Sequence, residues 1–337
     1  MVRTYADDYR GWPIAPRKKQ HLVRGSFLDP RTSENYHHGI DVSVRDDRPE
    51  RGAPLGRTHR VYALEGGRVW KVDDATGPGD DGLVRVGHFG YGHVDPVVKL
   101  GQRVSPGQLI GWTVEGQWHV HVTEWHFPRG DRERRVAVNP LSRRGKVAPY
   151  VDLFPPVIRE IRFFTPASPP WTSGLGRAVF PDAGFPLDPD RLSSLVDVRA
   201  RIEDPQSFQG WYRDVPVLGT GHHPARVHVT VTRLQDRTRV VDRDVFKSDV
   251  TLAPEGPAPI PFSHHYAPGT RQNLRAKTAL KLGRQGQGAL WFRLFAEPFI
   301  PYWNTTLLPN GRYRIKVSAW DLAGNRTSDS VDVGLNN

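Results

Sequence analysis

The sequence predicts an all-β protein, in which a small antiparallel β-sheet domain is followed by a β-sandwich domain. Short runs that alternate apolar and polar residues recur along most of the chain, separated by Gly, Pro and Asp. The 337 residues exceed the usual size of one compact core. The pattern breaks near residue 150, where Pro155 and Pro156 open a new series of runs. These observations favour two β domains.

The chain divides in order into an arm and two domains. Residues 1–35 are rich in Pro and charge and predict an arm that packs on the first domain. Residues 36–148 contain the short runs of the small β domain, with an acidic, Gly-rich loop at 73–82. Residues 149–337 contain the second domain.

The second domain has longer runs and a closing hairpin. Residues 313–321 and 328–333 both alternate and are joined by a turn at 323–325, which is similar to the last hairpin of immunoglobulin-like sandwiches. Residues 254–287 carry many Pro and Gly and little periodicity, and predict a long insertion. The remaining predicted strands are 157–164, 195–202, 226–234, 239–250 and 290–295.

Composition restricts the chemistry and the partners. Cysteine is absent, so neither disulfides nor thiolate ligands are available. The net charge is +11, and residues 1–150 carry +6 of it, from 24 Lys and Arg against 18 Asp and Glu. Such a diffuse positive charge favours polyanions as partners, such as anionic wall polymers, acidic glycans, nucleic acid or an anionic membrane. The alternative is a soluble, Arg-rich protein with no such partner. A nucleic-acid binder is the rival explanation of the charge, but no motif of interleaved basic and aromatic residues supports it, and we expect no nucleic-acid partner.

Hydrophobic segments for membranes or export are not evident. The first twenty residues include Arg3, Asp7, Asp8, Arg10 and Arg17 and no apolar run, so no signal peptide is visible. No later stretch is long and apolar enough for a transmembrane span.

Two short histidine motifs carry the strongest chemical signal. His119 and His121 lie two apart among β-favouring residues and share one face of a strand. His37 and Asp41 lie four apart, roughly 13 Å on a straight strand, so a bend is needed and Gly39 supplies it. A helix would also bring such positions together, but the alternation over 40–44 favours a strand. Two nitrogen ligands, one oxygen ligand and an open fourth position describe a hydrolytic zinc site.

The order of these motifs resembles the lysostaphin/LytM-type zinc metallopeptidases, which cut peptidoglycan peptides. The likeness covers roughly residues 20–145. Its elements are His37-x-Gly39-x-Asp41, a hairpin at 62–69, Tyr91-x-His93, a Gly-rich turn at 98–111, His119-x-His121, and Asn139-Pro140.

The resemblance implies a role for five residues and a reaction. The zinc ligands fall on His37, Asp41 and His121, and the two catalytic histidines that are not ligands fall on His93 and His119. One zinc ion per chain would serve hydrolysis of peptide bonds in peptidoglycan. A cell-envelope or secreted location follows from that substrate. Which of the two histidines is the base stays open.

One segment departs from the family pattern and keeps a rival function open. Residues 112–118 stand where the family has a Gly- and Ser/Thr-rich loop, and they include Trp112 and Trp118. With Trp125, these could stack on substrate or belong to the core, and Trp118 is favoured for the cleft because it adjoins His119. The altered loop sustains the alternative of a zinc-containing protein that binds wall or regulates another hydrolase without hydrolysis.

The other histidines are predicted not to bind metal. Those next to the motifs are expected to be solvated or packed on strands, and the two pairs in the second half lack a carboxylate at a suitable spacing. They are His38, His88 and His126, and the pairs His222-His223 and His264-His265.

Overall fold

The computed structural model confirms an all-β protein. Among the described residues the only α-helix is α1 (Phe262–His265), of four residues, and all paired strands are antiparallel apart from isolated bridges. The described residues are 11–30, 36–44, 48–75, 81–142, 145–167, 171–172, 178–179, 183–205, 223–253, 262–270, 290–295 and 302–337.

The first half is built on an eight-stranded sheet with a three-stranded sheet beside it. The large sheet runs in the order β1 (Val23–Gly25), β2 (Ile40–Ser43), β10 (His119–His126), β6 (Phe89–Gly92), β5 (Leu83–Val86), β4 (Gly67–Asp73) and β8 (Arg103–Val104), and β11 (Val136–Val138) also pairs with β10. The smaller sheet has the order β3 (Arg57–Tyr62), β9 (Leu109–Val114) and β7 (Val94–Pro96).

The second half is a sandwich of two four-stranded sheets. One sheet has the order β12 (Val157–Phe164), β15 (Leu195–Glu203) and β18 (Trp291–Arg293), with β19 (Trp303–Asn304) also on β15. The other has the order β17 (Arg239–Lys247), β16 (Arg226–Arg233), β20 (Gly311–Trp320) and β21 (Arg326–Leu335). The remaining elements are the ribbon of β13 (Trp171–Thr172) and β14 (Ala178–Val179), and the short 3₁₀ turns η2 (Pro128–Gly130), η3 (Pro189–Arg191) and η4 (Thr305–Leu307).

Alternation explains why the sandwich strands form. On β16, Val227, Val229 and Val231 are fully buried while the residues between them are partly exposed. Val229 lies opposite Val317 of β20 in the ladder. Each buried Val contributes roughly 1.5–3 kcal/mol relative to an exposed one. Strands β20 and β21 pair with each other and form the predicted closing hairpin.

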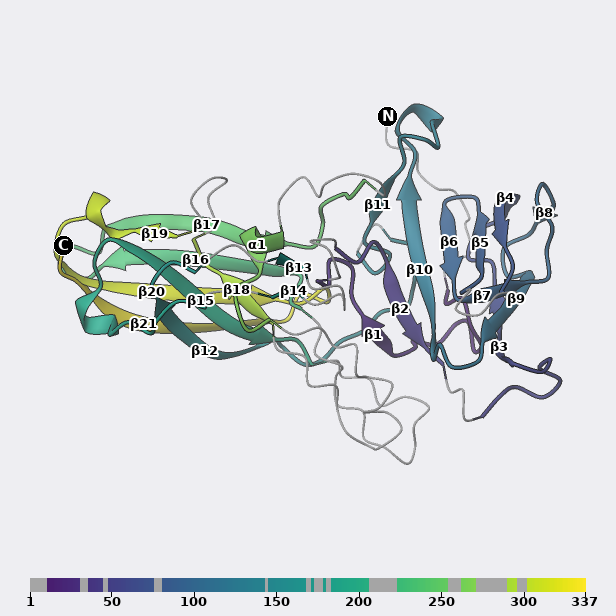
Figure 1. Ribbon diagram of the computed structural model, residues 1–337, viewed down its shortest axis with the longest axis horizontal. Helices are drawn as coiled ribbons and strands as arrows, with labels where there is room; N and C mark the ends of the chain where they lie inside the picture. The colour runs from purple at the N-terminus through teal and green to yellow at the C-terminus, as the bar shows by residue number, and fades with distance from the viewer. Residues whose placement is uncertain are drawn as a thin grey trace.

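The two halves form two lobes (Figure 1). These lobes share core residues. The sandwich core includes Phe27, Leu28 and Tyr36 from the beginning of the chain and Trp125 from β10. The first half has a second core cluster, between its own strands. Strand β1 therefore packs in the first lobe through Val23, whereas the loop that follows it enters the sandwich core.

The described part of the predicted insertion lies against the sandwich. Of residues 254–287, the described ones are 262–270, and they contain α1. Tyr266, just after α1, is fully buried and forms a bridge with Phe292 of β18. The segment thus extends the sandwich core instead of standing away from it.

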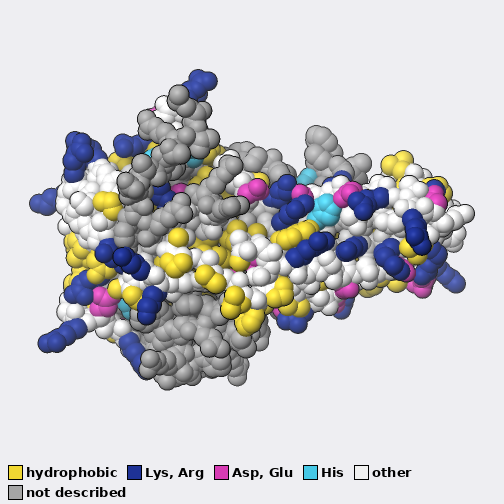
Figure 2. All heavy atoms as spheres, turned by 180° about the vertical axis from the view of Figure 1, so that it is seen from behind, with side chains coloured by type: hydrophobic (Ala, Val, Ile, Leu, Met, Phe, Trp, Pro, Cys, Tyr) yellow, Lys and Arg dark blue, Asp and Glu magenta, His cyan; other side chains and the backbone are white. Residues whose placement is uncertain are grey.

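Lys and Arg side chains are scattered over both lobes in Figure 2. Among the described residues, no helix has the length and hydropathy needed to cross a membrane.

Candidate metal centre

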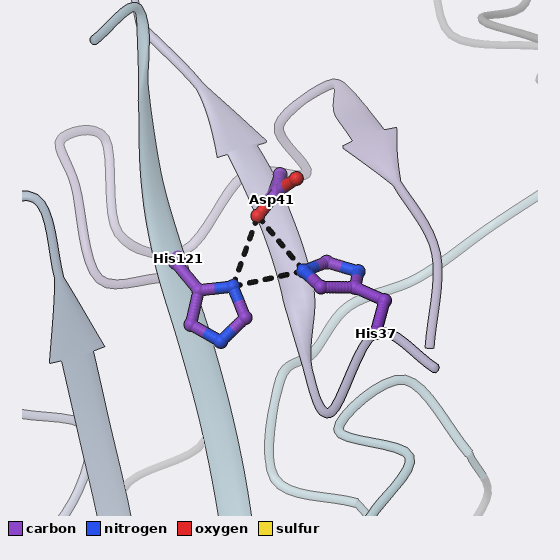
Figure 3. A group of neighbouring side chains, drawn as sticks. All are labelled: His37, Asp41 and His121. Atoms are coloured by element: carbon purple, nitrogen blue, oxygen red, sulfur yellow. Dashed lines mark hydrogen bonds and ion pairs between the residues drawn. The ribbon is translucent and has the colours of Figure 1, made fainter. Parts of the chain in front are cut away.

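The predicted metal ligands meet at the junction of β2 and β10. Asp41 of β2 lies directly opposite His121 of β10 in the antiparallel ladder, so both side chains emerge on one face. His37 approaches the same point from the loop before β2 (Figure 3). Strand pairing thus brings together residues eighty positions apart.

The prediction that both motifs lie on strands holds for Asp41, His119 and His121 but is wrong for His37. Strand β2 begins only at Ile40, and the chain bends at Gly39, as expected from the glycine. A Cβ on Gly39 would lie 2.2 Å from the carbonyl oxygen of Val122 on β10. The glycine is therefore required by the close approach of two backbones, which folds His37 back over the sheet.

The three donor atoms form a compact triangle. His37 Nε2 lies 2.8 Å from His121 Nδ1 and 3.0 Å from Asp41 Oδ1, and His121 Nδ1 lies 3.0 Å from the same oxygen. Ligands at about 2.0–2.2 Å from a tetrahedral zinc lie roughly 3.3 Å apart, so only a small expansion would admit the ion. Two imidazole nitrogens and one carboxylate oxygen are a donor set that suits zinc.

Outer hydrogen bonds orient both imidazoles. The Ser26 carbonyl oxygen accepts a hydrogen bond from His37 Nδ1 at 2.7 Å, which fixes the tautomer and leaves a lone pair on Nε2. His121 Nε2 lies 2.9 Å from Thr123 Oγ1, which leaves Nδ1 facing the cluster. Such outer partners hold ligating histidines in metal sites.

Asp41 carries a charge that the cluster stabilises. Its side chain is buried, and burial by itself would raise its pKa. The imidazoles of His37, His119 and His121 outweigh that effect and hold the pKa of Asp41 well below its ordinary value. A carboxylate that stays ionised is the form that binds a metal ion.

The two predicted catalytic histidines lie beside the ligands. His119 Nδ1 donates a hydrogen bond to the Gln117 carbonyl oxygen at 2.6 Å, and its Nε2 lies 3.5 Å from Asp41 Oδ1. The rings of His93 and His119 have centroids 4.3 Å apart. His93 Nδ1 also lies 3.5 Å from Asp81 Oδ2.

Burial keeps both of these histidines neutral. Desolvation lowers the pKa of His119 well below its ordinary value, opposed by Asp41 and assisted by Arg24 and His93. Desolvation also lowers the pKa of His93, opposed by Asp81. Near neutral pH both rings therefore have a lone pair that can accept a proton.

The centre is open on the side of His121 and His93. Their side chains are 26% and 20% exposed, whereas those of His37 and Asp41 are 5% and 8% exposed. Trp118 is also partly exposed and adjoins His119. The other two tryptophans are buried: Trp112 under Arg60, and Trp125 against Trp70.

The remaining histidines lie outside the ligand cluster. His88 Nδ1 donates a hydrogen bond to Glu65 Oε1 at 2.9 Å, and His126 is exposed. Among the described residues, His38 and the members of the two C-terminal pairs belong to no group of metal-ligating side chains. The first member of one pair, His222, lies outside the described residues.

Sequence reasoning missed the groups that support the centre. Ser26 acts through its backbone carbonyl, for which a sequence carries no signal. Asp81, in a loop, lies beside His93, and Arg24 of β1 acts on His119. Thr123 follows His121 at the i+2 spacing of one strand face, and this spacing could have identified it.

Comparison with known proteins adds little. No family model matches the chain, and no curated protein matches it. Among solved structures, the crystal structure of CbpA from L. salivarius REN is similar at 19% identity, covering 34% of this chain and 76% of that chain. Its TM-score is 0.24, and at that level the likeness carries no argument about fold or function.

Proposed function

We propose that this protein is a zinc-dependent endopeptidase that hydrolyses peptide bonds in peptidoglycan. The observation that carries the proposal is the convergence of His37, Asp41 and His121 within 3.0 Å, with His93 and His119 beside them. A purely structural zinc site is normally closed by four protein ligands. Here the three ligands have two neutral histidines beside them, and His121 and His93 are partly exposed.

Each group has a chemical task in such a reaction. Zinc held by the three ligands would act as a Lewis acid on the scissile carbonyl and lower the pKa of a water molecule. His119 holds its Nε2 lone pair toward the cluster and is placed to take the proton of the attacking water. His93 places a second ring nitrogen beside it, suited to a hydrogen bond with the oxygen that becomes negative.

The substrate class is supported by motif order. His37-x-Gly39-x-Asp41, then His93, then His119-x-His121 occur in the order of the lysostaphin/LytM-type peptidases. In those proteins the same five positions serve cleavage of peptidoglycan peptides. The cell-envelope or secreted location and the affinity for anionic wall polymers form part of the same proposal.

The experiment compares the zinc-loaded protein with two variants on purified peptidoglycan. New amino termini released from sacculi of several cross-bridge types are measured, together with zinc content. His119→Ala should abolish release and retain zinc, because this residue is not a ligand. His121→Ala should abolish release and lose zinc, because it removes one of three ligands.

Other outcomes would direct the function elsewhere. Zinc binding without release from any cross-bridge type would support the rival of a wall-binding or regulatory protein. Loss of zinc from His119→Ala would refute the assignment of ligands and catalytic residues given above.

A further inference from the structure

A second cluster of carboxylates lies in the seam between the two lobes. Asp152 belongs to the segment that leaves the first half, Asp204 follows β15, and Asp321 follows β20. One oxygen from each lies within 4.8 Å of the others. All three residues are buried, with exposures of 4%, 3% and 4%.

The charges in this cluster oppose one another. Burial raises the pKa of Asp204 well above its ordinary value, and the charges that add to the effect are those of Asp321 and Asp152. Burial also raises the pKa of Asp321, with Asp152 adding to it, although hydrogen bonds from Asn325 act against the shift. Three carboxylates gathered out of water are costly unless a cation or protons offset them.

One carboxylate oxygen of the cluster lacks a hydrogen-bond donor among the described residues. Asp204 Oδ1 is buried and has no hydrogen-bond partner among the described residues. The neighbouring carboxylates differ: Asp321 accepts from Asn325 N at 2.7 Å and from Asn325 Nδ2 at 2.6 Å. Asp152 accepts from Phe154 N at 3.1 Å. A buried carboxylate oxygen without a donor points to a missing ligand.

Surrounding contacts hold the cluster in place. Asn325 Nδ2 also donates to the backbone carbonyl of Asp152 at 2.8 Å, so one side chain ties this segment to the turn after β20. Tyr150 donates its hydroxyl to Asp152 Oδ2 at 3.5 Å. The donors are thus arranged by residues from both lobes.

Cavities reach the cluster from two sides. A surface cavity of about 1050 Å³ is lined by Tyr150, Asp152 and Asp321. A small internal cavity of about 10 Å³, room for roughly one water-sized group, borders Asp204 and Tyr150. The surface cavity thus reaches Asp152 and Asp321, and the small cavity reaches Asp204.

We propose that Asp152, Asp204 and Asp321 bind a calcium ion. This ion would hold the linker, the segment around Asp152 that joins the two lobes, against the sandwich. Calcium takes six to eight oxygens at about 2.3–2.6 Å, so two oxygens on one ion lie at most about 5.2 Å apart, which the cluster satisfies. The all-oxygen donor set disfavours zinc, which prefers nitrogen and sulfur. Magnesium keeps several waters and uses one or two carboxylates, so three converging carboxylates suit calcium better.

The test measures thermal unfolding of the full chain in metal-free buffer at neutral pH. One equivalent of zinc is present throughout, so the histidine site is filled in every sample. About 5 mM CaCl₂ should raise the Tm of the native protein by about 5 °C, and the same concentration of MgCl₂ should raise it by less than half as much. Direct titration with Ca²⁺ should give a stoichiometry near one.

Variants separate this site from others. Asp204→Asn should lose the calcium-dependent rise, yet remain at least as stable as the native chain without calcium, because it removes a repelled charge. Asp329→Asn, on an exposed position of β21, should keep the full rise. Terbium bound in place of calcium should luminesce when Tyr150 is excited, since its hydroxyl contacts Asp152.

Three results would overturn the proposal. Absence of a calcium-dependent rise and of terbium luminescence in the native chain would mean that the carboxylates share protons instead of an ion. An undiminished rise in Asp204→Asn would place the ion elsewhere. Equal effects of magnesium and calcium would refute the assignment of the ion.

Discussion

Nε2 of His223, in the sandwich lobe, lies 2.5 Å from the carbonyl oxygen of Phe27, in the loop that orients the proposed metal ligand His37. The adjacent carbonyl, of Ser26, accepts the hydrogen bond from His37 Nδ1. Tyr266 donates to the carbonyl of Leu28 at 3.0 Å. The second lobe therefore forms hydrogen bonds to the loop at Phe27 and Leu28, and the carbonyl of Ser26 in the same loop orients His37.

Replacing His223 should weaken zinc binding although this residue touches no ligand. His223→Ala frees the Phe27 carbonyl and loosens the Ser26 carbonyl beside it, so zinc affinity should fall by roughly tenfold, as for other outer partners of ligands. Competition with a chromophoric chelator measures the affinity. His126→Ala, at an exposed position on β10, is the matched control and should bind zinc normally. Unchanged zinc affinity in a folded His223→Ala protein would show that the contact between His223 and Phe27 does not support the metal centre.

Two aspartates near the centre should have separable effects. Asp41→Asn removes the carboxylate ligand and should lower zinc affinity at least about tenfold. Asp81→Asn should leave zinc affinity unchanged, because Asp81 contacts His93 and Gln117 and no ligand, but it should alter the pH profile of turnover. Zinc affinity and rates as a function of pH are measured for both. Loss of zinc from Asp81→Asn would contradict the geometry of the centre.

Gly39 should tolerate no side chain. Gly39→Ala places a Cβ 2.2 Å from the Val122 carbonyl, so β2 must move from β10, at a cost of roughly 1–3 kcal/mol. Zinc affinity should fall with it, because the bend holds His37 over the sheet. Chemical denaturation and zinc competition measure the two effects. Gly56→Ala is the control: it has φ +72° and open surroundings, so it should cost about 1 kcal/mol and leave zinc binding intact.

Stability should fall in mild acid partly through His21. Burial, more than any other effect, lowers the pKa of this histidine to about 4. Its folded pKa lies below its unfolded value of about 6.5, so between these values the unfolded chain binds the extra proton. Stability is thus lost as pH falls from about 6.5 to 4, by up to about 1.4 kcal/mol per pH unit.

Denaturant titrations across that pH range test the contribution. His21→Gln cannot titrate and should show a shallower loss of stability than the native chain. His126→Gln, at the exposed end of β10, should leave the slope unchanged. A slope unaltered by His21→Gln would mean that His21 keeps its ordinary pKa in the folded state.

Much of the architecture could be predicted because strands leave a local signal. The run 157–164 corresponds to β12, and the closing hairpin corresponds to β20 and β21. The five motif positions converge as the resemblance implied, since cross-strand register follows from alternation. The strand prediction was wrong for His37, because its position is set by the approach of β10 at Gly39, a contact between distant segments.

Other features of the sites depend wholly on tertiary contacts. Asp152, Asp204 and Asp321 are separated by more than fifty and more than a hundred residues and form no motif. They meet because the linker and two strand ends of different sheets reach one seam. Likewise, every residue has a backbone carbonyl like that of Ser26, so residue type does not reveal this contact. The orientation of His37 could therefore not be predicted from the sequence.

The placement of Phe27, Leu28 and Tyr36 within the sandwich core has a consequence for how this protein can be divided. A fragment ending near residue 148 would expose those apolar side chains to water and release the loop that steadies His37. Grafting the first lobe onto an unrelated partner would bring the same defect. The two lobes therefore depend on each other for their cores, and an engineered fusion must retain both.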